Sequence, residues 1–86
     1  MDYEVRYNET RLISSELWKL YKQCLEEIDG IIKGDDEEQD KWWSDVTDKF
    51  QTIVSPWNDT THEYYANSYC IACLEDIRQV WSLKTK

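Results

Sequence analysis

The chain of 86 residues carries 18 Asp and Glu against 10 Lys and Arg, a formal net charge of −8. This length leaves room for one domain with a modest core and no deep catalytic cleft, and the charge disfavours direct binding to nucleic acid or to an anionic membrane, because both need clustered Lys and Arg. Only two glycines and one proline, together with 12 aromatic residues, favour long helices over a turn-rich β fold.

Residues 1–7 alternate, with Tyr3, Val5 and Tyr7 on one side. Alternation over this length is typical of a short strand. Because the rest of the chain offers no second strand to pair with, we expect an ordered arm or an early helical turn more than a strand.

From about residue 9 to residue 33 the apolar spacing is helical. Asn8 is the expected N-cap, and Gly34 fits the position after the helix, where a left-handed residue is favoured. The apolar stripe comprises Ile13, Leu17, Leu20, Tyr21, Cys24, Leu25, Ile28, Ile31 and Ile32. Trp18 falls at the edge of this stripe.

A second helix is predicted over residues 36–54, with Asp35 as N-cap and an end before Ser55-Pro56, since a residue that precedes proline avoids the helical conformation. Its apolar stripe comprises Trp42, Trp43, Val46, Phe50, Ile53 and Val54. Acidic residues fill the opposite side of the helix, interrupted by Lys41.

A third helix is predicted over residues 61–83, with Thr60 as N-cap. Its stripe comprises Ala66, Tyr69, Cys70, Cys73, Leu74, Ile77, Val80 and Trp81. Tyr64, Tyr65, Ile71 and Ala72 lie off the stripe, so the first half of this helix is apolar nearly all round. Three helices joined by short loops predict an all-α, antiparallel three-helix bundle formed by the whole chain, residues 1–86.

The cysteines give a weak signal for a metal or redox site. Cys70 and Cys73 have CxxC spacing, and Cys24 and His62 could complete four zinc ligands. On one helix, however, His62 and Cys70 are roughly 12 Å apart along the axis, too far for one metal ion. All three cysteines also fall on or beside apolar stripes, so we interpret them as core residues and expect no metal and no cofactor.

Catalytic signals are also weak. A calcium loop over residues 29–40 fails because Ile31 and Lys33 occupy positions that need oxygen ligands. His62 is the only histidine and has no nucleophile context around it. We therefore expect a protein that is not an enzyme and has no catalytic residues. An odd number of cysteines without an N-terminal secretory segment favours a reducing compartment, the cytoplasm.

The acidic side of the second helix has the strongest functional signal. Ordinary solvation of a helix face explains part of it, but ten acids against two lysines between Glu26 and Asp48 also suit a basic protein partner. Adjacent tryptophans are typical binding anchors. The predicted partner-binding residues are Asp36, Glu37, Asp40, Trp42, Trp43, Asp45, Asp48, Tyr64 and Tyr65.

The favoured hypothesis is an inhibitor or antidote that blocks a basic, nucleic-acid-handling protein such as a nuclease by acidic surface mimicry. Phage-encoded inhibitors of host defence nucleases and toxin-neutralising immunity proteins have this size and charge, a similarity of physical type without a motif match. The alternative is a non-enzymatic subunit or adaptor of a larger assembly that uses the aromatic face of the third helix, with a homodimer as one version of it.

Overall fold

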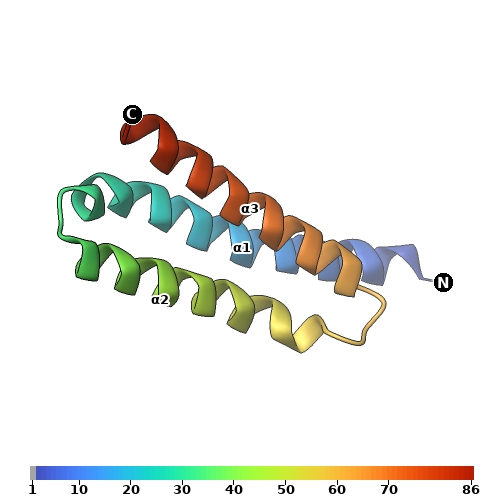
Figure 1. Cartoon of the computed structure of the whole chain (residues 1–86). Helices are drawn as coiled ribbons and strands as arrows, with labels where there is room; N and C mark the ends of the chain where they lie inside the picture. The colour runs from blue at the N-terminus through green and yellow to red at the C-terminus, as the bar shows by residue number, and fades with distance from the viewer. Residues whose placement is uncertain (1) are drawn as a thin grey trace.

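The computed structural model describes residues 2–86 and shows three helices, α1 (Tyr3–Ile32), α2 (Asp36–Val54) and α3 (Glu63–Lys84). A 3₁₀ turn, η1 (Ser55–Trp57), follows α2. Figure 1 shows α2 running back along α1, and α3 returning in the same direction as α1. The predicted all-α, antiparallel three-helix bundle is confirmed.

The start of α1 differs from the prediction. Asp2 is the N-cap, and its carboxylate accepts hydrogen bonds from the backbone N–H groups of Glu4 and Val5, so the helix begins at Tyr3 and not near residue 9. Asn8 therefore lies inside the helix and does not cap it, and the strand alternative is wrong for residues 3–7. Met1, which belonged to the same alternating segment, lies outside the described residues.

The end of α1 is completed by a side chain and not by a left-handed glycine. Lys33 and Gly34 follow the helix, and Gly34 does not adopt a positive φ. Instead, the side-chain amide of Gln39 donates hydrogen bonds to the carbonyls of Ile32 and Gly34, at 3.0 and 3.3 Å. These carbonyls have no partner within the helix. The Gln39 side chain of α2 therefore provides the hydrogen-bond donors that backbone N–H groups provide when a left-handed residue ends a helix.

Both bounds of α2 are as predicted from the sequence. The Asp35 carboxylate accepts the backbone N–H of Glu38 at 2.8 Å, and the helix ends at Val54, before Pro56. The reason given for this end is wrong, because Ser55, which precedes the proline, keeps a helical backbone (φ −53°, ψ −42°) and begins η1. Thr60 has a different role from the one predicted. Its hydroxyl accepts the backbone N–H of His62 at 3.2 Å, which stabilises the turn before α3, and α3 begins at Glu63, two residues later than expected.

The core is formed by the three predicted stripes. Four or five residues of each helix are buried, and the other stripe residues pack against them: Ile13, Leu17, Leu20, Cys24 and Ile28 from α1, Trp42, Val46, Phe50 and Val54 from α2, and Ala66, Cys70, Cys73 and Ile77 from α3. Phe50 is the largest fully buried side chain. The prediction that all three cysteines are core residues is confirmed for Cys24, Cys70 and Cys73.

Candidate functional site

The acids at the start of α2 have a structural role as well as a charge. Asp36, Glu37 and Glu38 occupy the first helical turn, after the cap at Asp35. Negative charge at a helix N-terminus is favourable because the unpaired N–H groups there carry a partial positive charge. Folding therefore accounts for part of the negative charge at this end of α2.

The remaining charge of α2 is not compensated. We call Asp36, Glu37, Asp40, Asp45 and Asp48 the α2 acidic face; all five side chains are exposed. Within residues 2–86, none of them forms an ion pair. Four acids of α1 and α3, by contrast, are paired with Lys or Arg: Glu16 with Lys19, Glu26 with Lys22, Glu75 with Arg78 and Asp29 with Lys84. The α2 acidic face thus places five unpaired acids on one helix, where their negative charge stays available to a partner.

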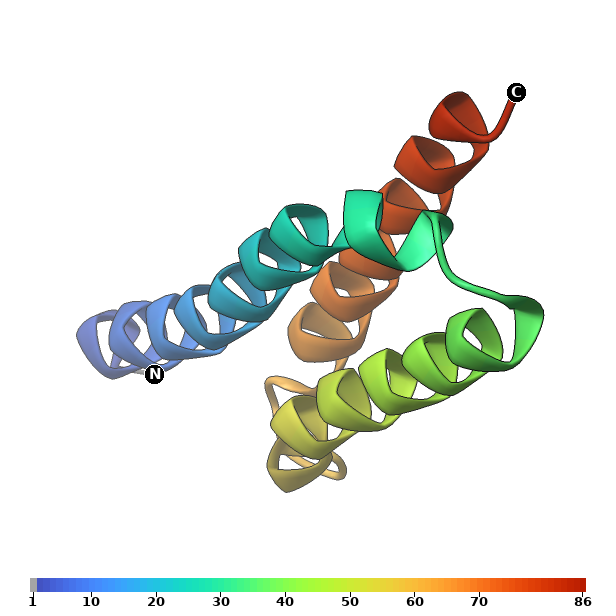
Figure 2. The ribbon, with the colours of Figure 1, turned by 90° about the vertical axis from the view of Figure 1, so that its left-hand side faces the viewer.

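The two tryptophans next to the acids mainly hold the bundle together. Trp42 is only 8 % exposed, and its indole N–H donates a hydrogen bond of 2.9 Å to a Glu27 carboxylate oxygen. This bond lowers the pKa of Glu27, because the donor favours the charged carboxylate. Trp42 also stacks on Trp81 of α3, and Trp43 packs against both rings with centroids 4.9 and 5.2 Å away. This tryptophan cluster, Trp42, Trp43 and Trp81, joins α2 to α3 at the end where the two helices diverge (Figures 1 and 2).

The predicted tyrosines lie elsewhere. Tyr64 is 86 % exposed in the first turn of α3, and Tyr65 is half-buried, with its ring 6.1 Å from that of Tyr69. The beginning of α3 lies beside the end of α2, so Asp36 and Asp40 are at the opposite end of the bundle (Figure 1). The structure therefore does not bring the tyrosines and the first acids of α2 into one site.

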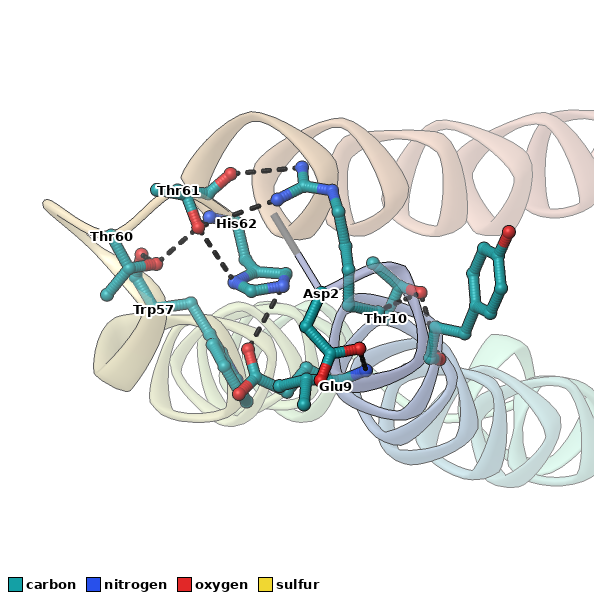
Figure 3. Close-up of polar contacts among 10 residues, drawn as sticks. Asp2, Glu9, Thr10, Trp57, Thr60, Thr61 and His62 are labelled. Atoms are coloured by element: carbon teal, nitrogen blue, oxygen red, sulfur yellow. Dashed lines mark hydrogen bonds and ion pairs between the residues drawn. The ribbon is translucent and has the colours of Figure 1, made fainter.

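A polar cluster that the sequence did not predict fastens the α2–α3 loop to α1 (Figure 3). His62 is buried, with Nδ1 3.4 Å from the Thr61 hydroxyl and its ring 5.4 Å from Trp57. Its Nε2 lies 3.0 Å from a Glu9 carboxylate oxygen, the distance of an ion pair, although the ring N–H is not aligned for a hydrogen bond. The guanidinium of Arg6 donates to the Thr61 carbonyl at 3.1 Å. Through these contacts His62 and Thr61 hold the α2–α3 loop against α1.

The cysteine thiols are poorly suited to chemistry. Burial raises the pKa of Cys24 and of Cys73 to about 11, and burial raises the pKa of Cys70 as well. Negative neighbours add to the effect, Glu27 at Cys24 and Asp76 at Cys73. Since the thiolate is the reactive species, these thiols are protected both by burial and by protonation.

We expect the native protein to react with a thiol reagent far more slowly than the unfolded chain, because all three thiols are buried and free. Labelling followed by mass spectrometry should find three modified cysteines in guanidinium chloride and almost none in buffer at neutral pH. A Ser82→Cys variant, with an exposed position, serves as the positive control. Rapid labelling of the unsubstituted native protein would contradict the expected burial.

No protein-family model, curated protein sequence or solved structure matches this chain. Residues 2–86 contain no group of three or more His, Cys, Asp or Glu side chains that could hold a metal ion. In the same range, no helix is both long and apolar enough to cross a membrane. A function is therefore inferred from the charges and exposed side chains of the bundle.

Proposed function

We propose that the protein is a small, non-enzymatic binding module whose α2 acidic face engages a basic surface on a nucleic-acid-handling protein and blocks it, as an inhibitor or antidote does. The observation that carries the proposal is the uncompensated charge of α2, where five exposed acids have no ion-pair partner within residues 2–86. Three free thiols are consistent with action in the cytoplasm.

The density of this charge supports mimicry of a nucleic acid. Six acids lie between Asp36 and Asp48, over about 18 Å of helix, which is roughly one acid per 3 Å. One strand of DNA carries a phosphate about every 3.4 Å along its axis. Lys41 and Lys49 reduce the net density. The acids are nevertheless held on one ordered helix, whose first half is fixed by the tryptophan cluster.

Charge of this kind accelerates association with a cationic partner and selects against acidic ones. A basic nuclease presents Lys and Arg for phosphates, and the same groups would pair with the carboxylates of α2. The protein would then compete directly with nucleic acid. Because exposed ion pairs are screened by salt, binding is expected to weaken as ionic strength rises.

The test compares two variants with equal charge. In the first, the α2 acidic face is neutralised by Asp→Asn and Glu→Gln at residues 36, 37, 40, 45 and 48. The matched control neutralises five acids elsewhere: Glu16, Glu26, Asp59, Glu63 and Glu75. Asp35 and Glu38 are kept in both variants, so that the N-cap of α2 is unchanged.

Each immobilised protein is exposed to a lysate of the source cells, and captured proteins are identified by mass spectrometry. The native protein and the control should capture the same basic nucleic-acid-handling protein, which added double-stranded DNA should release, whereas the α2 variant should lose it. If both variants capture the same proteins, or if DNA releases none of them, the mimicry proposal is wrong.

A second candidate is an adaptor that uses the aromatic face of α3. Tyr64 and Ile71 are both exposed on the outer side of this helix, and neither belongs to the core. Exposed apolar side chains on one helix face are typical of a protein interface. A Tyr64→Ser/Ile71→Ser variant that loses the captured partner, while the α2 variant keeps it, would favour this function over mimicry.

A further inference from the structure

An open groove with a volume of about 220 Å³ lies between α1 and α3. Three aromatic side chains, two small side chains and one carboxylate line it: Trp18, Tyr21, Tyr69, Ala72, Cys73 and Asp76. The volume is below the roughly 300–1,000 Å³ of pockets that enclose a drug-sized ligand. The groove therefore has room for one small chemical group, and the chemistry of its lining indicates which group.

The aromatic side chains make the groove attractive to a cation. The faces of Trp and Tyr rings carry partial negative charge, and a cation within about 6 Å of a ring centroid is attracted to them. Trp18 is half exposed and already has such a contact, because the Lys22 ammonium lies 5.6 Å from the centroid of its ring. Lys22 itself does not line the groove. The rings that do line it are open to a further cation.

Asp76 adds a full negative charge to the same groove. The Tyr21 hydroxyl donates a hydrogen bond to one Asp76 oxygen, which holds the ring of α1 and the carboxylate of α3 together. This bond raises the pKa of Tyr21 to about 12, so the phenol stays neutral and keeps donating at physiological pH. Asp76 is exposed and, in the described part of the chain, forms no ion pair with Lys or Arg. Its charge is therefore available to a ligand.

The groove offers few partners for hydrogen bonds, which decides between kinds of cation. Both walls are helices, whose backbone N–H and C=O groups are paired within each helix. A lysine ammonium brings three N–H donors and an arginine guanidinium five, and in this groove most of them would lose water without gaining an acceptor. A quaternary ammonium has no N–H group, and its methyl groups suit apolar surface. The lining thus favours a quaternary ammonium over Lys or Arg.

We propose that the groove between α1 and α3 binds the quaternary ammonium group of a small molecule of the choline class. The rings of Trp18, Tyr21 and Tyr69 contact the methyl groups, and the Asp76 carboxylate balances the charge. A free small molecule suits the groove better than a methylated lysine of a protein, because the helical walls offer a peptide main chain no unpaired backbone group. The net charge of −8 also favours the approach of a cation.

The inference is independent of the proposed function. No residue of α2 lines the groove, and no residue of the α2 acidic face belongs to it. Loss of one activity therefore leaves the other unchanged, and each is tested by its own variants.

The first experiment is a titration of the purified full chain with choline chloride, from about 0.1 to about 50 mM at constant ionic strength, followed by nuclear magnetic resonance. We expect a saturable shift of the Trp18 indole N–H and of the Ala72 and Cys73 amides. The matched ligand is the neutral analogue of choline in which carbon replaces nitrogen, because it has the same shape without the charge. It should bind roughly tenfold more weakly. Equal binding of the two ligands, or no saturable shift with choline, would overturn the proposal.

The second experiment compares variants through the Ala72 and Cys73 amides. Trp18→Ala and Asp76→Asn should each raise the Kd for choline roughly tenfold, because they remove a ring and the charge. Leu12→Ala is the control for the first, since Leu12 is 53 % exposed and lies about 120° from Trp18 on the helical wheel. Glu75→Gln is the control for the second, since it removes one exposed acid beside Asp76. Equal effects of a variant and its control would contradict the site.

The third experiment tests the source of the ammonium group. A short peptide with one trimethyllysine should bind no more tightly than choline, and the same peptide with unmodified lysine should bind roughly tenfold more weakly than the methylated one. If the trimethyllysine peptide bound more than roughly tenfold tighter than choline, the assignment to a small molecule would be wrong and the ligand would be a methylated protein. Equal binding of the two peptides would contradict selection for a quaternary ammonium.

Discussion

Replacing Phe50 with alanine is expected to lower the free energy of unfolding by about 3–5 kcal/mol, a large part of the total stability of a chain this short. Phe50 is fully buried and lies in the centre of the α2 stripe. Its ring is the largest fully buried side chain, and the rigid helices around it can only partly close the cavity that alanine would leave. A loss of 4 kcal/mol corresponds to a melting temperature lower by roughly 20 °C.

Thermal and urea unfolding followed by circular dichroism measure this effect. Gln51→Ala is the control, because Gln51 is exposed on the next position of the same helix and should change the unfolding free energy by no more than about 0.5 kcal/mol. Phe50→Leu should fall between the two, since it keeps most of the apolar volume. A Phe50→Ala variant that loses less than 1 kcal/mol would show that Phe50 is not at the centre of the core.

The core of this protein was predictable because burial on a helix imposes a period of 3.6 residues. Ile13, Leu17, Cys24 and Ile28 repeat with that period, and all are buried. The first residues of α1 escaped prediction for the same reason. They extend beyond the start of α3, so no core imposes the helical period on them, and their alternation left an arm, a helical turn and a strand all open. The available signal was Asp2, an N-cap residue type with Glu4 in the first turn after it.

The candidate site was predictable only in part. Sequence periodicity assigns Asp45 and Asp48 to the outer side of α2, and both are exposed. Periodicity alone does not place Tyr64 relative to Asp36. Their separation follows from the antiparallel order of the predicted helices, because both residues lie at the beginnings of helices that run in opposite directions (Figure 1). The register of α1 against α3 is likewise outside the reach of periodicity, because contacts between the two helices such as Tyr21 to Asp76 fix it.

Replacing Trp42 with alanine is the second change from which we expect a large effect, a loss of about 3–5 kcal/mol in the free energy of unfolding. Trp42 is buried, stacks on Trp81 at 5.9 Å and contacts Trp43 edge-on at 4.9 Å. Removing it leaves Trp43 and Trp81 without their shared partner at the end where α2 and α3 diverge. The near-ultraviolet circular dichroism of the native protein should fall together with its stability, because the fixed packing of these rings generates that signal.

A Trp42→Phe variant separates packing from hydrogen bonding. Phenylalanine keeps an aromatic ring in the cluster but cannot donate to Glu27, so we expect a smaller loss of about 1–2 kcal/mol at neutral pH. The bond from Trp42 lowers the pKa of Glu27 in the folded protein below its ordinary value of 4.5. Its stabilising contribution is therefore present above pH 4.5 and lost as the pH falls through the lower, folded-state pKa.

Urea unfolding of both proteins at several pH values between neutral and acid tests this dependence. The difference in unfolding free energy between the native protein and Trp42→Phe should be largest near neutral pH and should shrink in acid as Glu27 becomes protonated. Trp42→Ala should remain strongly destabilised at every pH, because the cavity and the lost stacking do not titrate. A Trp42→Phe difference that stays constant into acid would mean that Trp42 stabilises α2 through packing alone, and that the contact with Glu27 adds nothing measurable.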